Sequence, residues 1–85
     1  NTQKNEMEPI LLELPQGGES FAMDPHSGEE FGYIIEGSVV LISGEKSYTL
    51  HKGETFYLSG KNRHYLKNEK KTTAKVLWIS TPPLF

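Results

Sequence analysis

Two histidines and a glutamate are the residues of this chain best suited to chemistry. His26 and Glu30 lie four positions apart, and His64 follows much later. Imidazole nitrogens and carboxylate oxygens are good ligands for Fe, Mn, Zn, Ni or Cu, and two histidines with one carboxylate form the common non-haem iron triad. Without a metal, the same side chains would anchor the polar groups of a small organic ligand. The first alternative makes an enzyme and the second makes a sensor.

The length and composition of the chain limit what must hold these residues in place. Its 85 residues are enough for one domain, and a chain of this size buries only roughly 60–65% of its unfolded surface. The absence of cysteine excludes disulfides and thiolate metal sites. We expect a homodimer, because self-association is a common way for a small domain to gain buried surface.

Hydropathy argues against a membrane or secreted protein, and the charge distribution bears on nucleic-acid binding. No apolar run exceeds five residues and the N-terminal residues are polar, so we expect no membrane contact, no signal peptide and a cytoplasmic location. Residues 61–75 carry six of the nine bases, whereas residues 1–37 carry eight of the eleven acids. We interpret the basic stretch as lysines that keep loops and edge strands from associating, not as a nucleic-acid site.

Glycines at short, regular intervals indicate an all-β fold. Gly37, Gly44, Gly53 and Gly60 are seven to nine residues apart, and β-branched and aromatic residues fill the segments between them. We predict a small jelly-roll barrel of about eight short antiparallel strands in two packed sheets. The predicted strands are residues 10–14, 20–23, 31–35, 38–43, 47–50, 55–58, 63–67 and 75–80. Residues 1–8 are expected to form a polar arm or the end of a linker, and residues 9–85 the domain.

Several of the predicted strands are apolar on both faces, among them residues 31–35, 39–42 and 76–79. A strand with one face in water normally alternates between apolar and polar residues. We therefore expect a second subunit or another domain to cover the outer face of the barrel. Inside it, aromatic side chains are expected to line a ligand pocket. The predicted pocket residues are Tyr33, Phe56, Tyr65 and Trp78.

The glycine frame around the three candidate ligands resembles the two motifs of the cupin family. The matching residues are His26, Glu30 and Gly37 of the first motif and Gly53, His64 and Asn68 of the second. Asp24 stands where the family has its first histidine. The resemblance implies a cupin barrel with a divalent metal (Fe, Mn, Zn, Ni or Cu) held by Asp24, His26, Glu30 and His64. The aspartate weakens that site without abolishing it.

A narrower resemblance covers residues 28–37, 53–57 and 76–83. These segments are similar to the cupin domains that end helix-turn-helix bacterial transcriptional regulators. The similarity implies a sensor domain that binds a small-molecule effector and contacts DNA only through an N-terminal domain outside this chain. Such a domain is not an enzyme. The alternative is a small metal-dependent cupin enzyme of the dioxygenase or isomerase type, with His26, Glu30 and His64 as metal ligands.

The same residues also have purely structural interpretations. Glu30 could pair with Arg63 at the surface, where an ion pair contributes about 0–1 kcal/mol. His64 could simply flank a strand, and His26 could be a turn residue after a proline. Asn68 could organise its turn by bonding to the backbone. Burial and hydrogen bonding distinguish these interpretations from the functional ones.

Overall fold

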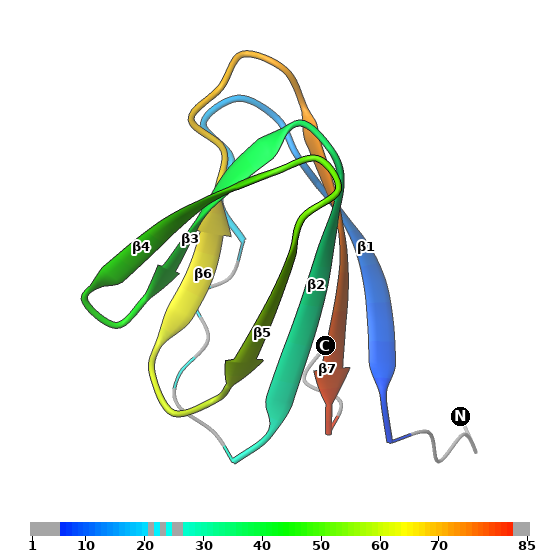
Figure 1. Ribbon diagram of the computed structural model, residues 1–85, viewed down its shortest axis with the longest axis vertical. Helices are drawn as coiled ribbons and strands as arrows, with labels where there is room; N and C mark the ends of the chain where they lie inside the picture. Colours follow the sequence, from blue (N-terminus) through cyan, green and yellow to red (C-terminus); the bar gives the residue numbers. More distant parts are fainter. Residues whose placement is uncertain (1–5, 21, 23, 25–26, 83–85) are drawn as a thin grey trace.

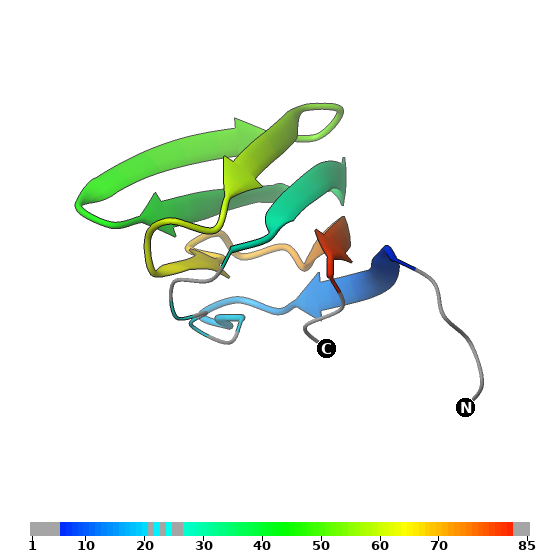
Figure 2. The same cartoon turned by 90° about the horizontal axis from the view of Figure 1, so that it is seen from below.

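The fold consists of two antiparallel sheets packed against each other (Figure 1). The computed structural model describes residues 6–20, 22, 24 and 27–82. Its strands are β1 (Glu8–Leu14), β2 (Glu29–Glu36), β3 (Ser38–Ser43), β4 (Lys46–His51), β5 (Thr55–Ser59), β6 (His64–Lys67) and β7 (Ala74–Thr81). The first sheet has the order β1-β7-β2-β5 and the second the order β4-β3-β6, which Figure 2 shows from one end.

The all-β prediction is confirmed, and seven of the eight predicted strands are present with ends that differ by at most two residues. The exception is the segment predicted over residues 20–23. There, the described residues form one isolated bridge, between Glu19 and Lys67. Ser20 donates its backbone N–H to the Leu66 carbonyl (2.9 Å) and accepts the Leu66 N–H on its hydroxyl (2.9 Å). Phe21 and Met23 lie outside the described residues.

Three of the regularly spaced glycines make the turns that join the central strands. Gly37, Gly44 and Gly53 have φ values of 77°, 62° and 88°. Glycine takes these left-handed conformations without the steric cost that a side chain would add. The glycine spacing in the sequence therefore reported turn positions correctly. In the part of the chain that the structure describes, no helix has the length and apolar character needed to cross a membrane.

The core lies between the two sheets and follows the alternation expected of β-strands. On β7, Ala74, Val76, Trp78 and Ser80 are buried, whereas the residues between them are only half-buried. The buried apolar residues are Leu14, Ile34, Val39, Leu41, Phe56, Leu66, Ala74, Val76 and Trp78. The largest of these side chains, Trp78, is 1% exposed and occupies the middle of the first sheet.

Asn68 fastens the loop between β6 and β7 to the end of β1. Its side-chain Nδ2 donates to the carbonyls of Leu14 and Thr72, both at 2.8 Å, and its Oδ1 accepts the Lys70 N–H at 2.8 Å. Asn68 is 1% exposed, so these bonds satisfy an amide that water cannot reach. The turn-organising role predicted for Asn68 is confirmed.

A close approach of Phe56 to the backbone explains the glycine in the middle of β2. Gly32 pairs with Trp78 on one side and with Phe56 on the other. The Phe56 and Trp78 rings meet edge to face, with centroids 5.7 Å apart and planes at 87°. A Cβ at Gly32 would lie 2.0 Å from Phe56 Cε2, so a side chain here must displace the ring.

Gly32→Ala is therefore expected to lower the free energy of unfolding by about 1–3 kcal/mol, the usual cost of overpacking a core. Urea unfolding followed by Trp78 fluorescence measures this change. The control is the same substitution in a Phe56→Leu background, where the smaller side chain leaves room for the methyl group. An equal loss in both backgrounds would show that the Phe56 ring is not the cause.

Candidate functional site

Three buried side chains from three strands meet inside the molecule and share hydrogen bonds. His64 Nε2, on β6, lies 2.5 Å from Glu30 Oε2, on β2. Trp78 Nε1, on β7, donates to Glu30 Oε1 at 2.7 Å. Exposure is 1% for Glu30, 0% for His64 and 1% for Trp78. Glu30 and Trp78 belong to the first sheet, and His64 belongs to the second. This polar network therefore links the two sheets across the core.

The hydrogen bonds of His64 determine where its protons lie. Its Nδ1 is 2.8 Å from the carbonyl oxygen of Asn62, which can only accept, so Nδ1 carries a proton. A second proton must then lie between Nε2 and Glu30 Oε2. If it lies on nitrogen, the two side chains form a charge-assisted hydrogen bond between imidazolium and carboxylate.

The surroundings of His64 favour that ion pair. Burial lowers the pKa of His64, but three effects act against it: the hydrogen bond to Glu30, the hydrogen bond to the Asn62 carbonyl and the negative charge of Glu30. Together they outweigh burial, so the His64 pKa is raised above its ordinary value of 6.5. Glu30 is thus not the surface partner of Arg63 that one interpretation of the sequence suggested; that interpretation is wrong.

Of the other two predicted metal ligands, only Asp24 lies in the part of the chain that the structure describes. Asp24 is an exposed residue whose side chain is 91% accessible, and its Oδ1 lies 3.8 Å from Arg63 Nε. The predicted ligand His26 lies outside the described residues. Among the residues that the structure does describe, no group of three or more His, Cys, Asp or Glu side chains converges as a metal site would require.

The chemistry of Glu30 and His64 fits a metal only in part. The bond from His64 Nδ1 to a backbone carbonyl is the outer-shell contact that metal-binding histidines usually make. However, two ligands bound to one metal at about 2.1 Å each and at right angles lie roughly 3.0 Å apart. The 2.5 Å separation here is that of atoms sharing a proton, and Trp78 already uses the second carboxylate oxygen. These residues alone do not make a metal site.

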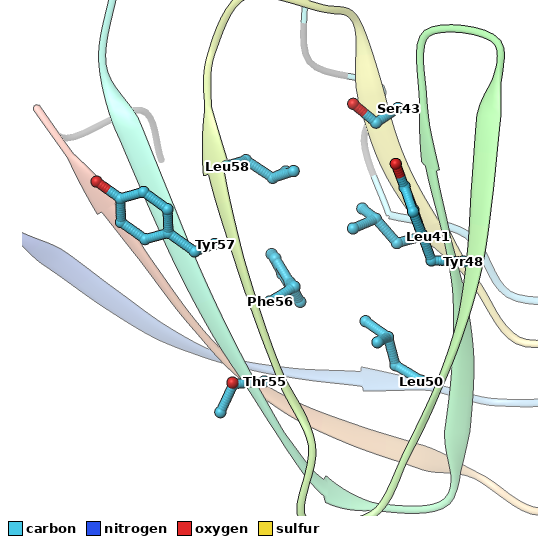
Figure 3. A pocket seen from close by; sticks show the side chains of 8 residues that line it. All are labelled: Leu41, Ser43, Tyr48, Leu50, Thr55, Phe56, Tyr57 and Leu58. Carbon is cyan, nitrogen blue, oxygen red and sulfur yellow. The ribbon is translucent and has the colours of Figure 1, made fainter.

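A groove of about 270 Å³ opens beside this network, between β5 and the β3–β4 hairpin (Figure 3). Its lining residues are Leu41, Ser43, Tyr48, Leu50, Thr55, Phe56, Tyr57 and Leu58. The side chains of Leu41, Leu50, Phe56 and Leu58 point into it, whereas the Tyr57 side chain points away (Figure 3). The volume is close to the lower limit of small-molecule sites, about 300 Å³.

Two residues that line the groove are cross-strand neighbours of residues in the polar network. Leu58 pairs with Glu30 on the neighbouring strand, and Ser43 pairs with His64. Phe56, in the middle of the groove wall, packs against the ring of Trp78. A molecule in the groove would therefore lie next to residues that neighbour Glu30, His64 and Trp78.

The four aromatic residues predicted to line a pocket are divided between the two faces of their sheets. Phe56 lines the groove, and Trp78 lies in the polar network. Tyr33 is 39% exposed, on the outer face of the first sheet. Tyr65 follows the inward-pointing His64 directly in β6 and is half-buried on the opposite face. Neighbouring strand residues point to opposite faces, which is why neither tyrosine reaches the interior.

Sequence reasoning did not foresee that Trp78 donates to Glu30. The tryptophan was expected in a pocket wall, yet a buried indole N–H needs an acceptor. Ser80, fully buried and paired with Glu30 in the register of β2 and β7, was also missed. Its period-two spacing from Trp78 on one strand was the available signal, because residues two apart share a face.

The free energy of unfolding is expected to fall as pH rises from below 6.5 through the raised pKa of His64. At low pH both the folded and the unfolded chain bind the proton, and the ion pair contributes fully. Above 6.5 the unfolded chain releases its proton first, so the folded state binds more protons and loses stability with increasing pH. Urea unfolding at a series of pH values measures the slope.

His64→Gln should flatten this dependence, whereas His51→Gln, at the exposed end of β4, should preserve it. Proton NMR of the His64 ring provides a second readout that needs no variant. A His64 midpoint at or below 6.5 would contradict the ion pair.

Known proteins with related sequences and folds complete the description of the site. An uncharacterised protein of Methanocaldococcus jannaschii, MJ1618, is 29% identical over 70 residues, and the match covers 82% of this chain but only 56% of that protein. The crystal structure of TT1209 from Thermus thermophilus superimposes with a TM-score of 0.86 at 25% identity, covering 94% of this chain and 76% of the other.

A third similar structure is a sugar phosphate isomerase of the cupin superfamily from Silicibacter pomeroyi, with a TM-score of 0.82 and 23% identity. It covers 93% of this chain and 52% of the other. At that identity the likeness shows the fold alone. The pattern of the cupin domain family matches residues 10–80, which span both sheets and hold Glu30, His64 and Trp78. The chain therefore belongs to the cupin domain family.

Proposed function

We propose that this cupin domain is a non-catalytic sensor. It binds a small organic effector in the groove between β5 and the β3–β4 hairpin. It belongs to a bacterial transcriptional regulator whose DNA-binding domain lies outside this chain. The observation that carries the proposal is the buried hydrogen-bond network of Glu30, His64 and Trp78 directly behind an open apolar groove.

The hydrogen bonds within the network support binding over metal catalysis. Both oxygens of Glu30 and both nitrogens of His64 have hydrogen-bond partners. A Lewis-acid site requires donor atoms that are free to bind the metal and positions left open for substrate. The described atoms instead bond to one another, and we infer that they support the groove wall.

The lining of the groove indicates the chemical class of the effector. Four apolar side chains point into it, and the hydroxyl groups of Ser43 and Tyr48 lie along one side (Figure 3). About nine groups of the size of a water molecule would fill the volume. We infer a small, mostly apolar molecule with one or two polar groups that bond to these hydroxyls.

The position of the groove gives a route from binding to signal. One wall is β5, the edge strand of the first sheet, and the other is the β3–β4 hairpin of the second. An effector that touches both walls favours one separation of the two sheets over another. Because a ligand shifts an equilibrium only through its different affinity for two states, this separation is the coordinate that it changes.

The alternative is a metal-dependent enzyme, and one observation favours it. Glu30 and His64 come from the two halves of the sequence and meet side by side in the interior. The similar structure from Silicibacter pomeroyi is described as a sugar phosphate isomerase. For this function His26 would have to join the pair, and the proton shared by Glu30 and His64 would have to leave.

A thermal-shift screen distinguishes the two functions. We expect small organic metabolites to include at least one that raises Tm, and Mn, Fe, Ni, Cu and Zn ions to leave Tm unchanged. Leu50→Trp, which fills the groove, should abolish the metabolite shift. Thr49→Trp, one residue earlier and on the outer face of β4, is the matched control and should retain it.

Two results would refute the sensor proposal. A stoichiometric divalent metal that survives dialysis and is lost in His64→Ala would establish the metal site instead. A gene with no helix-turn-helix segment encoded upstream of Asn1 would refute the regulator assignment, while leaving effector binding by the groove to be decided by the screen.

A further inference from the structure

The wall that β3 and β4 give to the groove changes from apolar to polar along its length. Leu41 pairs with Tyr48, and Ser43, two residues closer to the β3–β4 turn, pairs with Lys46. Cross-strand partners share a face of the sheet, and so do residues two apart on one strand. Since Leu41 and Ser43 both line the groove, Lys46 lies on the groove side of the sheet, at the end nearest the turn.

A row of polar side chains crosses the second sheet at this end of the groove. Ser43 lies between His64 on β6 and Lys46 on β4. His64 is fully buried and bonded to Glu30, whereas Lys46 is exposed. The row therefore runs from the buried network to the solvent, and its outer end carries a positive charge. Here this end of the groove is called the polar end.

Two acids near the polar end leave that charge largely available to a ligand. Glu30 already bonds to His64 and Trp78, so its carboxylate is occupied within the interior. Glu45 precedes Lys46 but belongs to the turn, where it is exposed. A surface contact between these neighbours would be a weak ion pair that an incoming anion can displace.

The opposite wall of the groove adds backbone groups of both kinds. Residues 55–58 all line the groove, although successive side chains of a strand point to opposite faces, so the groove reaches the edge of β5. Alternate residues of an antiparallel pair bond to the neighbouring strand. Gly60 donates its N–H to the Gly28 carbonyl at 2.8 Å. The alternation from that bond directs the N–H and C=O groups of Tyr57 and Ser59 to the free edge.

We propose that the effector is an apolar carboxylate whose charged group binds at the polar end. This inference rests on the proposed function and names the chemical class of its ligand. The hydroxyls of Ser43 and Tyr48 and the edge of β5 could bond equally well to a neutral amide. Lys46 distinguishes the two, because an ammonium only donates and its hydrogen bonds to an anion are about twice as strong as neutral ones.

The apolar part of the ligand has a defined place under this proposal. Figure 3 shows the Ser43 and Tyr48 hydroxyls together at the upper end of the groove, with Leu50 at the lower end. Leu41 and Phe56 face each other between them. A hydrocarbon chain that begins at the polar end would therefore run along these three apolar side chains.

Calorimetric titration of the wild-type chain with heptanoate and with heptanamide tests the proposal. Each probe has about nine non-hydrogen atoms, which matches the volume of the groove, and the two differ in charge but hardly in shape. Heptanoate is expected to bind about fivefold more tightly at low salt. Added salt should weaken the binding of heptanoate and leave that of heptanamide unchanged, because ions screen a charge at an open site.

Three variants locate the binding. Lys46→Gln should reduce the affinity for heptanoate to that for heptanamide, without changing the affinity for heptanamide. Lys52→Gln removes the same charge from the exposed turn between β4 and β5 and should keep the preference for the acid. Leu50→Trp should abolish the binding of both probes. Circular dichroism shows whether each variant remains folded, and the wild-type comparison of acid and amide needs no variant.

Several results would overturn the carboxylate class. These are equal affinities of the wild-type chain for the two probes, tighter binding of heptanamide, and equal effects of Lys52→Gln and Lys46→Gln. Each of them leaves binding in the groove intact, provided that Leu50→Trp still abolishes it. Failure of both probes to bind would also overturn the carboxylate class, whereas the metabolite screen decides separately whether the groove binds any effector.

Discussion

The carboxylate of Glu30 is the group on which the arrangement of the interior depends. A buried carboxylate without partners costs several kcal/mol, so its two oxygens must both be satisfied. His64 reaches one oxygen from the second sheet, and Trp78 reaches the other from the neighbouring strand. Further constraints follow from this pair of bonds. The Asn62 carbonyl fixes the His64 ring, and the position of Trp78 brings Phe56 over the backbone of Gly32.

The parts of the fold that local rules control could be predicted from the sequence. The glycines at three turns take left-handed backbone conformations, so their spacing gave the strand boundaries. Motif spacing also brought Glu30 and His64 together, although they are 34 residues apart. What the spacing could not supply was the chemical state of the pair, since a shared proton or a bound metal depends on a separation of tenths of an ångström.

The phase and the register of the strands were harder to obtain. Glu30 and Tyr33 lie three apart on one strand, so they cannot both face the interior, and the alternation could have excluded Tyr33 once Glu30 was placed inside. The same alternation could not identify Trp78 as the hydrogen-bond donor to Glu30. Trp78 pairs with Gly32 and reaches Glu30 diagonally, through the register that joins the first part of β2 to β7 before the bulge between Ile34 and Glu36. Long-range register of this kind leaves no local mark in the sequence.

One strand, β2, departs from the usual distribution of residues on both of its faces. It carries the buried acid Glu30 inside and the aromatic residues Phe31 and Tyr33 outside. Replacing a buried ion pair by apolar residues of similar volume is often neutral or stabilising by about 1–4 kcal/mol. Apolar residues in place of both Glu30 and His64 would thus leave this small domain as stable or more stable. The domain also exposes apolar surface that an isolated domain does not need. Stability of the single chain explains neither choice. The proposed function accounts for both if the polar network supports an effector-binding groove on one face of the sheet and if the exposed Phe31 and Tyr33 contact a partner on the other.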